Sequence, residues 1–329
     1  MVTVCVDAMG GDESSDVVLE GIHQALVSDP ELQVLVAGLP EVVEPFCATH
    51  ARTQPLVCTQ TISMEEHPAT AVRTKRDSSI VCSCRAVKDG RAQGFFSAGS
   101  TGAIFTAATL EIGRIRTIKR PAIAYAVPGL SGKKTVFLDL GANADARPAT
   151  LVQFAYMGRA YARNILHVKD PSVALLSNGT EPTKGSEAVI AAHKALAEAG
   201  PWFSGNCESS DILAGKVDVV VTDGFTGNVV LKMIEGTVKY LYTQLKGQAA
   251  QNMGYAVGLS LAKGALKRIA VDLSGEEQGG AMLLGLKAPV LIGHGSTSVA
   301  AIKHGTLACA HAIRSNLASK IASDLVRES

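Results

Sequence analysis

A polar turn follows one short run of β-branched residues and opens a helical pattern. Residues 217–222 are VDVVVT, and residues 224–228 are GFTGN before apolar residues resume. A turn in this position presents unpaired backbone N–H groups and the positive end of a helix dipole, and both bind anions. Thr226 and Asn228 are therefore candidate phosphate ligands, with Asn228 also a candidate catalytic residue and Asp223 shaping the turn. The alternative is that Thr226 or Asn228 only caps the helix.

Two other strand ends carry a side chain that can bind or protonate an anion. Residues 173–177 run into a loop with Lys184, which is a candidate phosphate-binding and catalytic residue unless it is a solvated surface lysine. Residues 290–293 lead to His294, where glycine on both sides leaves the ring room to approach a ligand. We expect His294 to act as a catalytic residue, although a single histidine is more often structural. The next helix opens with further candidate phosphate ligands, namely Gly295, Ser296 and Thr297.

Glycine-rich loops follow six of the predicted strands, at residues 9–11, 99–102, 141–143, 178–185, 224–228 and 293–298. In open α/β sheets, ligands bind outside the carboxyl ends of the strands, where loops and helix N-termini converge. We therefore expect the six loops to share one face and to form a pocket for an oxyanion, although a tight turn explains glycine in any single loop. Residues expected to shape that pocket are Asp7, Gly10, Gly11, Asp12, Ser100, Thr101, Asn143 and Asp223.

Short β-branched runs alternate with longer helical patterns, which indicates a mostly parallel sheet with helices on both faces. The predicted strands are residues 2–7, 32–37, 93–97, 135–140, 173–177, 217–222 and 289–292. No linker or repeat divides the chain, so residues 1–329 are expected to form one three-layer α/β/α domain. Residues 225–269 contain two long helical patterns with a break near residues 247–254, and we expect this pair to project from the body.

The composition argues against several classes of protein. The formal net charge is +1, which provides no general field for nucleic acid, so no nucleic-acid partner is expected. The seven cysteines have no zinc-finger spacing, and we interpret them as reduced thiols without a metal site. We expect no export signal and no bilayer-spanning segment. The P-loop, dinucleotide and serine-hydrolase fingerprints are missing, so neither a cofactor nor an acyl-serine intermediate is expected.

Seven segments, by their order and spacing, resemble the bacterial phosphate acyltransferases of phospholipid synthesis nearly from end to end. They are DAMGGD (7–12), AVRTKRDSS (71–79), SAGSTGA (97–103), LDLGAN (138–143), GTEPTKG (179–185), DVVVTDGFTGN (218–228) and GAMLLGLKAPVLIGHGS (280–296). Two positions depart from the family pattern. Ser100 stands where the family usually has Asn, and Ser177 and Asn178 replace the usual pair before Gly179.

The resemblance implies transfer of a long-chain fatty acyl group from acyl carrier protein to inorganic phosphate, giving acyl phosphate for phosphatidic acid synthesis. It also implies a fold like that of phosphotransacetylases and of isocitrate and isopropylmalate dehydrogenases. A homodimer is implied as well, and a cytoplasmic enzyme with peripheral membrane contact. Phosphate is already an anionic nucleophile, so the reaction needs positioning and charge stabilisation more than a strong base. Lys184, Asn228 and the helix after His294 are candidates to bind it.

Two basic regions are candidates for docking the acidic carrier protein. The first consists of Arg73, Lys75 and Arg76. The second lies on the later helix of the projecting pair and consists of Lys263, Lys267 and Arg268. That helix also has an apolar face that fits either a membrane interface or a dimer partner. Its predicted membrane contacts are Met253, Val257, Leu261 and Leu266.

Two other functions stay open from the sequence. A phosphotransacetylase that uses coenzyme A thioesters needs the same kind of anion pocket. A noncatalytic scaffold that binds an acyl carrier or a membrane needs no chemistry at all. A dehydrogenase of the related fold is disfavoured, because the chain has no nicotinamide fingerprint.

Overall fold

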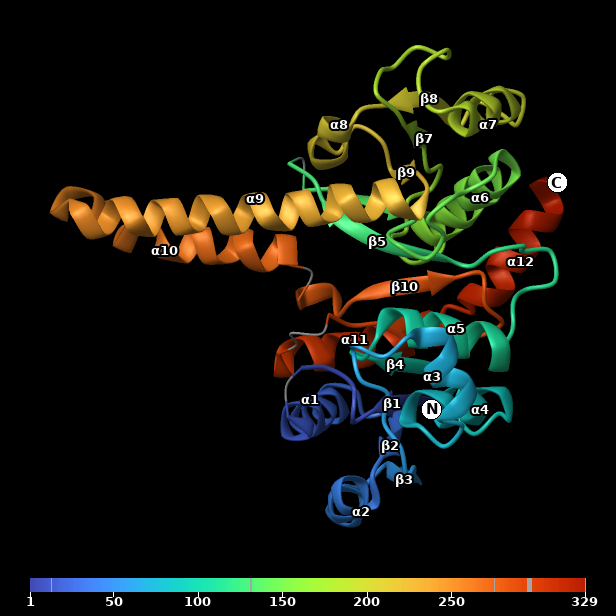
Figure 1. Ribbon diagram of the computed structural model, residues 1–329, viewed down its shortest axis with the longest axis vertical. Helices are drawn as coiled ribbons and strands as arrows, with labels where there is room; N and C mark the ends of the chain where they lie inside the picture. The colour runs from blue at the N-terminus through green and yellow to red at the C-terminus, as the bar shows by residue number, and fades with distance from the viewer. Residues whose placement is uncertain (13, 131, 275, 295–297, 329) are drawn as a thin grey trace.

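The computed structural model describes residues 1–12, 14–130, 132–274, 276–294 and 298–328 (Figure 1). Within these ranges the chain forms one 11-stranded sheet in the order β3-β2-β1-β4-β11-β10-β5-β6-β9-β7-β8. The strands are β1 (Val2–Asp7), β2 (Leu32–Gly38), β3 (Thr53–Val57), β4 (Gly94–Ser97), β5 (Ala122–Pro128), β6 (Lys134–Leu138), β7 (Val173–Leu176), β8 (Phe203–Cys207), β9 (Val219–Val221), β10 (Ala281–Leu284) and β11 (Val290–Ile292).

Helices cover both faces of the sheet. One face carries α1 (Ser15–Ser28), α2 (Pro40–Thr49), α6 (Pro148–Asn164), α7 (Glu187–Ala197), α11 (Val299–Arg314) and α12 (Leu317–Glu328). The other face carries α3 (Pro68–Thr74), α4 (Ser79–Lys88), α5 (Thr101–Glu111), α8 (Ser209–Ala214) and the start of α9 (Gly224–Gln251). Because successive strand residues point to opposite faces, neighbours such as Phe95 and Phe96 are both fully buried but belong to different cores.

The two halves of the sheet run in opposite directions. β1, β2, β3, β4 and β11 are parallel to one another, as are β6, β7, β8 and β9. Between the halves, β10 is antiparallel to β11 and to β5, and β5 is antiparallel to β6. The carboxyl ends of the two parallel sets therefore lie at opposite edges of the sheet. The six glycine-rich loops, which were predicted to share one face, therefore follow strands of two opposite directions: three follow β1, β4 and β11, and three follow β6, β7 and β9.

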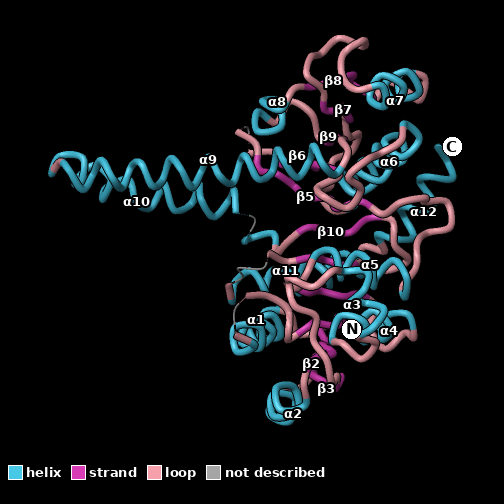
Figure 2. Tube along the Cα trace, viewed as in Figure 1, coloured by secondary structure: helices cyan, strands magenta, loops and turns pink. Residues whose placement is uncertain are grey.

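A pair of long helices projects from the body, and we call it the arm (Figures 1 and 2). It consists of α9 and α10 (Met253–Ser274), which pack against each other along their length, with the chain reversing at Asn252. A short 3₁₀ helix, Glu276–Gln278, then leads the chain back into the sheet at β10. No helix in the described part of the chain combines the length and apolar character needed to span a bilayer. The predicted fold class, with a mostly parallel sheet and a projecting helix pair, is confirmed.

Candidate active site

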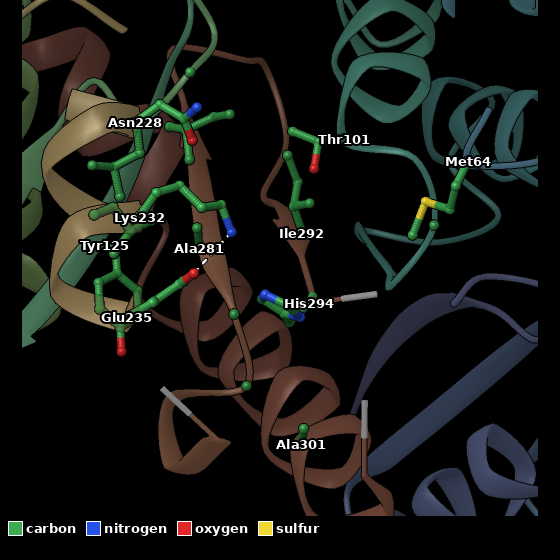
Figure 3. A pocket seen from close by; sticks show the side chains of 18 of the residues that line it. Met64, Thr101, Tyr125, Asn228, Lys232, Glu235, Ala281, Ile292, His294 and Ala301 are labelled. Atoms are coloured by element: carbon green, nitrogen blue, oxygen red, sulfur yellow. Dashed lines mark hydrogen bonds and ion pairs between the residues drawn. The ribbon is translucent and has the colours of Figure 1, made fainter. Parts of the chain in front are cut away.

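A cavity of about 680 Å³ opens between the two halves of the sheet, lined by the first residue of α5, the start of α9 and the N-terminus of α11 (Figure 3). Its wall combines apolar side chains, five glycines and a few polar groups. The apolar contributors are Met64, Ile123, Tyr125, Leu140, Leu231, Ala281, Ile292 and Ala301. The polar contributors are Thr101, Asn228, Lys232, Glu235, His294 and Ser298. The glycines are Gly99, Gly141, Gly279, Gly280 and Gly293.

Loops from both halves of the sheet contribute to this cavity, although the two sets of strands run in opposite directions. Thr101 follows β4 and Asn228 follows β9, five steps away in the strand order, and both line the cavity. Four of the six predicted loops contribute lining residues: 99–102, 141–143, 224–228 and 293–298.

The start of α9 is fixed against the loop that follows β6. Asp223 caps the helix, because its carboxylate accepts hydrogen bonds from the backbone N and the hydroxyl of Thr226, both at 2.8 Å. The N–H of Gly224 donates to the carbonyl of Asn143 at 2.7 Å. A Cβ at Gly227 would overlap the carbonyl oxygen of Asp139, so glycine permits the close approach of helix and loop. This packing aims Asn228 past Gly141 into the cavity.

A stripe on α9 continues the cavity wall beyond Asn228. Leu231, Lys232 and Glu235 also line the cavity, at the spacing of three and four residues that places side chains on one helix face. Figure 3 shows Lys232 reaching from α9 into the cavity, with Glu235 beside it and His294 on the far side. The ammonium of Lys232 and the carboxylate of Glu235 form an ion pair at 2.8 Å. This stripe was not among the residues predicted from the sequence, although its spacing from Asn228 signals it.

A buried carboxylate organises the loop that follows β6. Asp139 accepts backbone N–H bonds from Ile123, Ala142 and Asn143, and a further bond from the side-chain amide of Asn143 at 2.8 Å. The same amide donates to the carbonyl of Pro121 at 2.8 Å. Burial raises the pKa of Asp139, and its hydrogen bonds counteract part of that rise. Asn143 thus holds the loop in place and does not itself line the cavity.

The opposite wall is fixed by contacts between β1 and β4. The hydroxyl of Ser97 donates to the buried carboxylate of Asp7 at 2.8 Å and accepts from the N–H of Gly99 at 3.0 Å. A Cβ at Gly10 would lie 2.7 Å from the nitrogen of Gly99, so glycine allows the two loops to touch. Burial raises the pKa of Asp7 despite these hydrogen bonds. The arrangement places Gly99 and Thr101, the first residue of α5, on the cavity wall.

The floor comes from the antiparallel strands in the middle of the sheet. Gly280 has a φ of +131°, and a Cβ there would collide with the carbonyl of Ile292. Tyr125 from β5 lines the cavity nearby, and the side-chain amide of Gln278 donates to the carbonyl of Ala126 at 2.6 Å. Burial raises the pKa of Tyr125, and the charge of Glu235 raises it further. The phenol therefore stays neutral.

His294 lies where β11 ends and lines the cavity across from α9 (Figure 3). Gly295, Ser296 and Thr297, the predicted phosphate ligands after it, lie outside the residues that the structure describes. Ser298 follows as the N-cap of α11, and its hydroxyl accepts from the N–H of Ala301 at 3.1 Å. The cavity thus meets a helix N-terminus on this side, where a helix dipole favours an anion.

Comparison with known proteins gives the family. A model of the family described as "Fatty acid synthesis protein" matches residues 2–320. The phosphate acyltransferase of Levilactobacillus brevis is 43% identical over 92% of this chain and 89% of its own length. That of Heliobacterium modesticaldum is 42% identical over 97% of this chain and 96% of its own. The chain belongs to the fatty acid synthesis protein family.

The fold of this family member is also found in solved structures of distant sequence. A phosphotransacetylase from Streptococcus pyogenes has a TM-score of 0.60 and 19% identity, covering 95% of this chain and 94% of that one. A branched-chain phosphotransacylase from Enterococcus faecalis has a TM-score of 0.59 and 17% identity, covering 95% and 99%. At these identities the similarity establishes the fold alone, and it confirms the predicted likeness to phosphotransacetylases.

Several residues that the sequence predicted for the site lie outside the cavity lining. Lys184 is exposed in the loop after β7, one strand farther from the sheet centre than β9. The backbone N–H and hydroxyl of Thr226 are both bonded to Asp223, as the capping alternative anticipated. Ser100 is buried as the N-cap residue of α5, while Gly11 and Asp12 lie in the loop after β1, outside the cavity wall.

The first predicted docking set is partly engaged within the chain. Lys75 donates to the carboxylate of Glu66 at 2.7 Å and to the carbonyl of Thr61 at 2.8 Å. Arg76 forms an ion pair with Glu111 at 2.8 Å, and Arg73 is exposed on α3. On α10, Lys263, Lys267 and Arg268 are all exposed. The predicted membrane contacts Met253, Val257 and Leu261 are also exposed, whereas Leu266 is half-buried.

Proposed function

We propose that this chain transfers a fatty acyl group from an acyl carrier protein thioester to inorganic phosphate and so supplies acyl phosphate for phospholipid synthesis. The observation that carries the proposal is its identity of 42–43% with proteins named phosphate acyltransferase over more than nine-tenths of the chain. The cavity supports the proposal, because its lining joins apolar side chains with a few groups that bind anions.

The proposed reaction needs no covalent enzyme intermediate. A phosphate oxygen attacks the thioester carbonyl carbon, the new C–O bond forms, and the carbonyl oxygen becomes an oxyanion. When the oxyanion collapses, the C–S bond breaks, and the departing thiolate takes up a proton. In this proposal the amide of Asn228 donates a hydrogen bond to phosphate, and backbone N–H groups of the glycine loops stabilise the oxyanion. His294 donates a hydrogen bond or a proton to the phosphate or the departing sulfur.

The apolar part of the cavity suits the acyl chain. Ile123, Leu140 and Ile292 are buried, and Met64 and Leu231 complete a surface without a charge. Each buried CH₂ of an acyl chain contributes about 0.8 kcal/mol of binding. A fatty acyl thioester therefore gains affinity here that a short acyl group does not.

Lys184 remains a proposed phosphate-binding residue, but its loop must move for it to reach the cavity. The loop from 180 to 187 is exposed throughout, and Lys184 lies outside the cavity lining. To reach phosphate, this loop would have to close over the cavity after substrate binds. Loop closure of this kind excludes water, which would otherwise hydrolyse acyl phosphate.

We propose that the arm contacts the cytoplasmic membrane surface. Met253 and Leu261 are each 84% exposed and are eight residues apart, with Val257 midway on the same face of α10. Residues 236–271 contain five basic residues and no Asp or Glu: Lys239, Lys246, Lys263, Lys267 and Arg268. A basic residue near an anionic lipid surface contributes about 1 kcal/mol to membrane binding.

The same arm is proposed to pack against a second copy of the chain, which would cover exposed side chains such as Tyr240 and Leu241 on α9.

We propose that the carrier protein docks on exposed cations of α3 and of the arm. Arg73 lies on α3, whose first residue, Pro68, packs against Gly102 of α5, and Thr101 beside it lines the cavity. Lys75 and Arg76 are close in sequence but already paired with carboxylates. Arg73 is therefore the residue of this set whose charge is best placed for an acidic partner. Lys263, Lys267 and Arg268 on the arm are the second proposed set.

The test is incubation of the purified protein with a long-chain acyl carrier protein thioester, with and without phosphate. Phosphate-dependent formation of acyl phosphate, trapped with hydroxylamine, is the expected result. Short-chain acyl-coenzyme A is the comparison substrate, and preferential turnover of it would favour a phosphotransacetylase. Thioester that stays intact with phosphate present would favour a noncatalytic scaffold.

The arm is tested separately with liposomes and by sedimentation. Reversal of charge at Lys263 and Lys267 is expected to weaken binding to anionic vesicles. Unchanged vesicle binding, together with a loss of dimer in analytical ultracentrifugation, would mean that this face only packs against a second copy.

A further inference from the structure

The charges that line the cavity are few. Lys232 is the one lysine or arginine among its described lining residues, and Glu235 is the one carboxylate. Both belong to α9 and lie on the stripe that begins at Asn228. Lys232 is one helical turn from Asn228, and Glu235 is almost one further turn along. A single helix thus presents an amide, a cation and an anion in a row along one wall.

The ion pair between Lys232 and Glu235 contributes little to the stability of the helix. The ammonium and carboxylate are 2.8 Å apart, with 57% and 35% of their side chains exposed. A pair of this kind at a spacing of three residues stabilises a helix by roughly 0.2–0.5 kcal/mol. Many exposed faces of α9 and α10 could hold such a pair at no cost to a substrate site. Its position on the cavity wall, shown in Figure 3, therefore requires another explanation.

Phosphate binding gives that explanation. A lysine is a compact cation that forms strong, charge-assisted hydrogen bonds with phosphate oxygens. While the cavity is empty, the carboxylate of Glu235 is paired with the ammonium of Lys232 and holds this long side chain in one direction. Phosphate carries more negative charge than a carboxylate, so it can replace Glu235 as the partner of Lys232. Asn228, on the same face, then binds a second oxygen of the same anion.

We propose that Lys232 is the phosphate-binding cation of this cavity and that Glu235 is a positioning residue that competes with phosphate for it. The inference rests on the proposed acyl transfer to phosphate and adds the residue that holds the nucleophile. It also differs from the assignment of that role to Lys184, which lies outside the cavity lining. The two residues must have opposite effects: loss of the cation weakens phosphate binding, whereas loss of the competing carboxylate strengthens it.

The experiment measures the dissociation constant of inorganic phosphate by titration calorimetry and the KM for phosphate in the acyl phosphate assay. Lys232→Gln is expected to raise both by about tenfold or more, which is the loss of one charge-assisted hydrogen bond. Lys232→Arg is expected to restore binding to within about threefold, because the cation is kept. Glu235→Gln is expected to lower both by about threefold, and the KM for the acyl thioester should stay unchanged throughout.

Lys239→Gln is the matched control, because Lys239 lies on the same helix beyond the cavity and loses the same charge. Its phosphate binding is expected to equal that of the unaltered protein. Equal binding by Lys232→Gln would overturn the inference, as would a Glu235→Gln variant that binds phosphate more weakly. If Lys232→Gln does not fold by circular dichroism, Glu235→Gln and Lys232→Arg still decide the question.

The two readouts separate this inference from the proposed function. Phosphate binding that depends on Lys232 in a protein that forms no acyl phosphate would refute the acyl transfer and retain the phosphate site. Acyl phosphate formation with a phosphate KM that is the same in Lys232→Gln would retain the function and refute the role of Lys232.

Discussion

In the sheet, side chains as large as Phe95, Phe96 and Phe154 are fully buried, whereas on the arm Met253 and Leu261 are each 84% exposed. The same type of residue is thus enclosed by the chain in one region and left uncovered in the other. Apolar surface is costly to expose, at about 25 cal/mol per Å², and the exposed side chains of the arm support its proposed contact with a surface outside the chain. We expect the buried side chains of the body to contribute most of the stability of the fold.

The sharpest test of that contrast uses one substitution at two positions of α9. Gly227→Ala places a Cβ onto the carbonyl oxygen of Asp139 in the body, and we expect it to destabilise the fold by about 3 kcal/mol or more. Gly236→Ala meets no atom within 4 Å on the arm and is expected to stabilise the helix by about 0.5–1 kcal/mol. Urea denaturation of both variants measures the difference, and similar midpoints would contradict it.

A smaller effect is expected at an ion pair that ties the body together. Arg314 at the end of α11 donates two hydrogen bonds to the carboxylate of Asp29, at 2.6 and 3.0 Å, and this contact lowers the pKa of Asp29. A lowered pKa in the folded state gives stability that is present above the ordinary pKa of 3.8 and lost as the pH falls through the lowered value. Asp29→Asn should therefore cost about 1 kcal/mol at neutral pH.

The difference between Asp29→Asn and the unaltered protein should shrink toward zero as the pH falls below 3.8 and through the lowered pKa. Denaturation curves at neutral and acidic pH measure it. A difference that stays constant with pH would show that the asparagine acts by another route than the lost ion pair.

The smallest effect on stability, with a large effect on contacts, is expected on the arm. Leu261→Gln changes a side chain that packs against little of the chain, so the free energy of unfolding should shift by no more than about 0.5 kcal/mol. Binding to anionic vesicles should fall, because the replaced side chain is apolar and outward-facing. Ile104→Gln, at a fully buried position of α5, is the matched control and should unfold the body instead.

The sequence predicted the strands of the two parallel sets better than the strands between them. The runs at 2–7, 32–37 and 93–97 match β1, β2 and β4 within one or two residues, because both of their faces are buried and their residues are continuously apolar. β5 and β10 were missed, as were β3 and β8 at the two edges of the sheet. β5 and β10 reverse the direction of the sheet, and nothing local in a strand records whether its neighbour is parallel or antiparallel.

The loop residues that line the cavity were predicted from the sequence, whereas the lining residues in the interior of α9 were not. Asn228, Thr101 and His294 come from turns with glycine, and the cavity brings all three together. Lys184 comes from the same kind of turn but lies outside the cavity lining, because β7 is farther from the centre of the sheet than β9. The strand order reveals this position, and the sequence does not. Lys232 belongs to the interior of a helix, and its direction depends on how the start of α9 packs against the loop after β6. The sequence carries the spacing of the stripe but not this packing.

One uninterrupted helix, α9, runs from the cavity wall to the tip of the arm. α9 has 28 residues and is about 42 Å long, with its root fixed by Asp223 and by the close approach of Gly227 to Asp139. Lys232 lies about 12 Å from that root, so a rigid pivot that moves the tip by about 4 Å moves Lys232 by only about 1 Å. Movement at the far end of the helix is therefore reduced about fourfold at Lys232, so shifting contacts of the tip would leave the proposed phosphate-binding residue nearly in place.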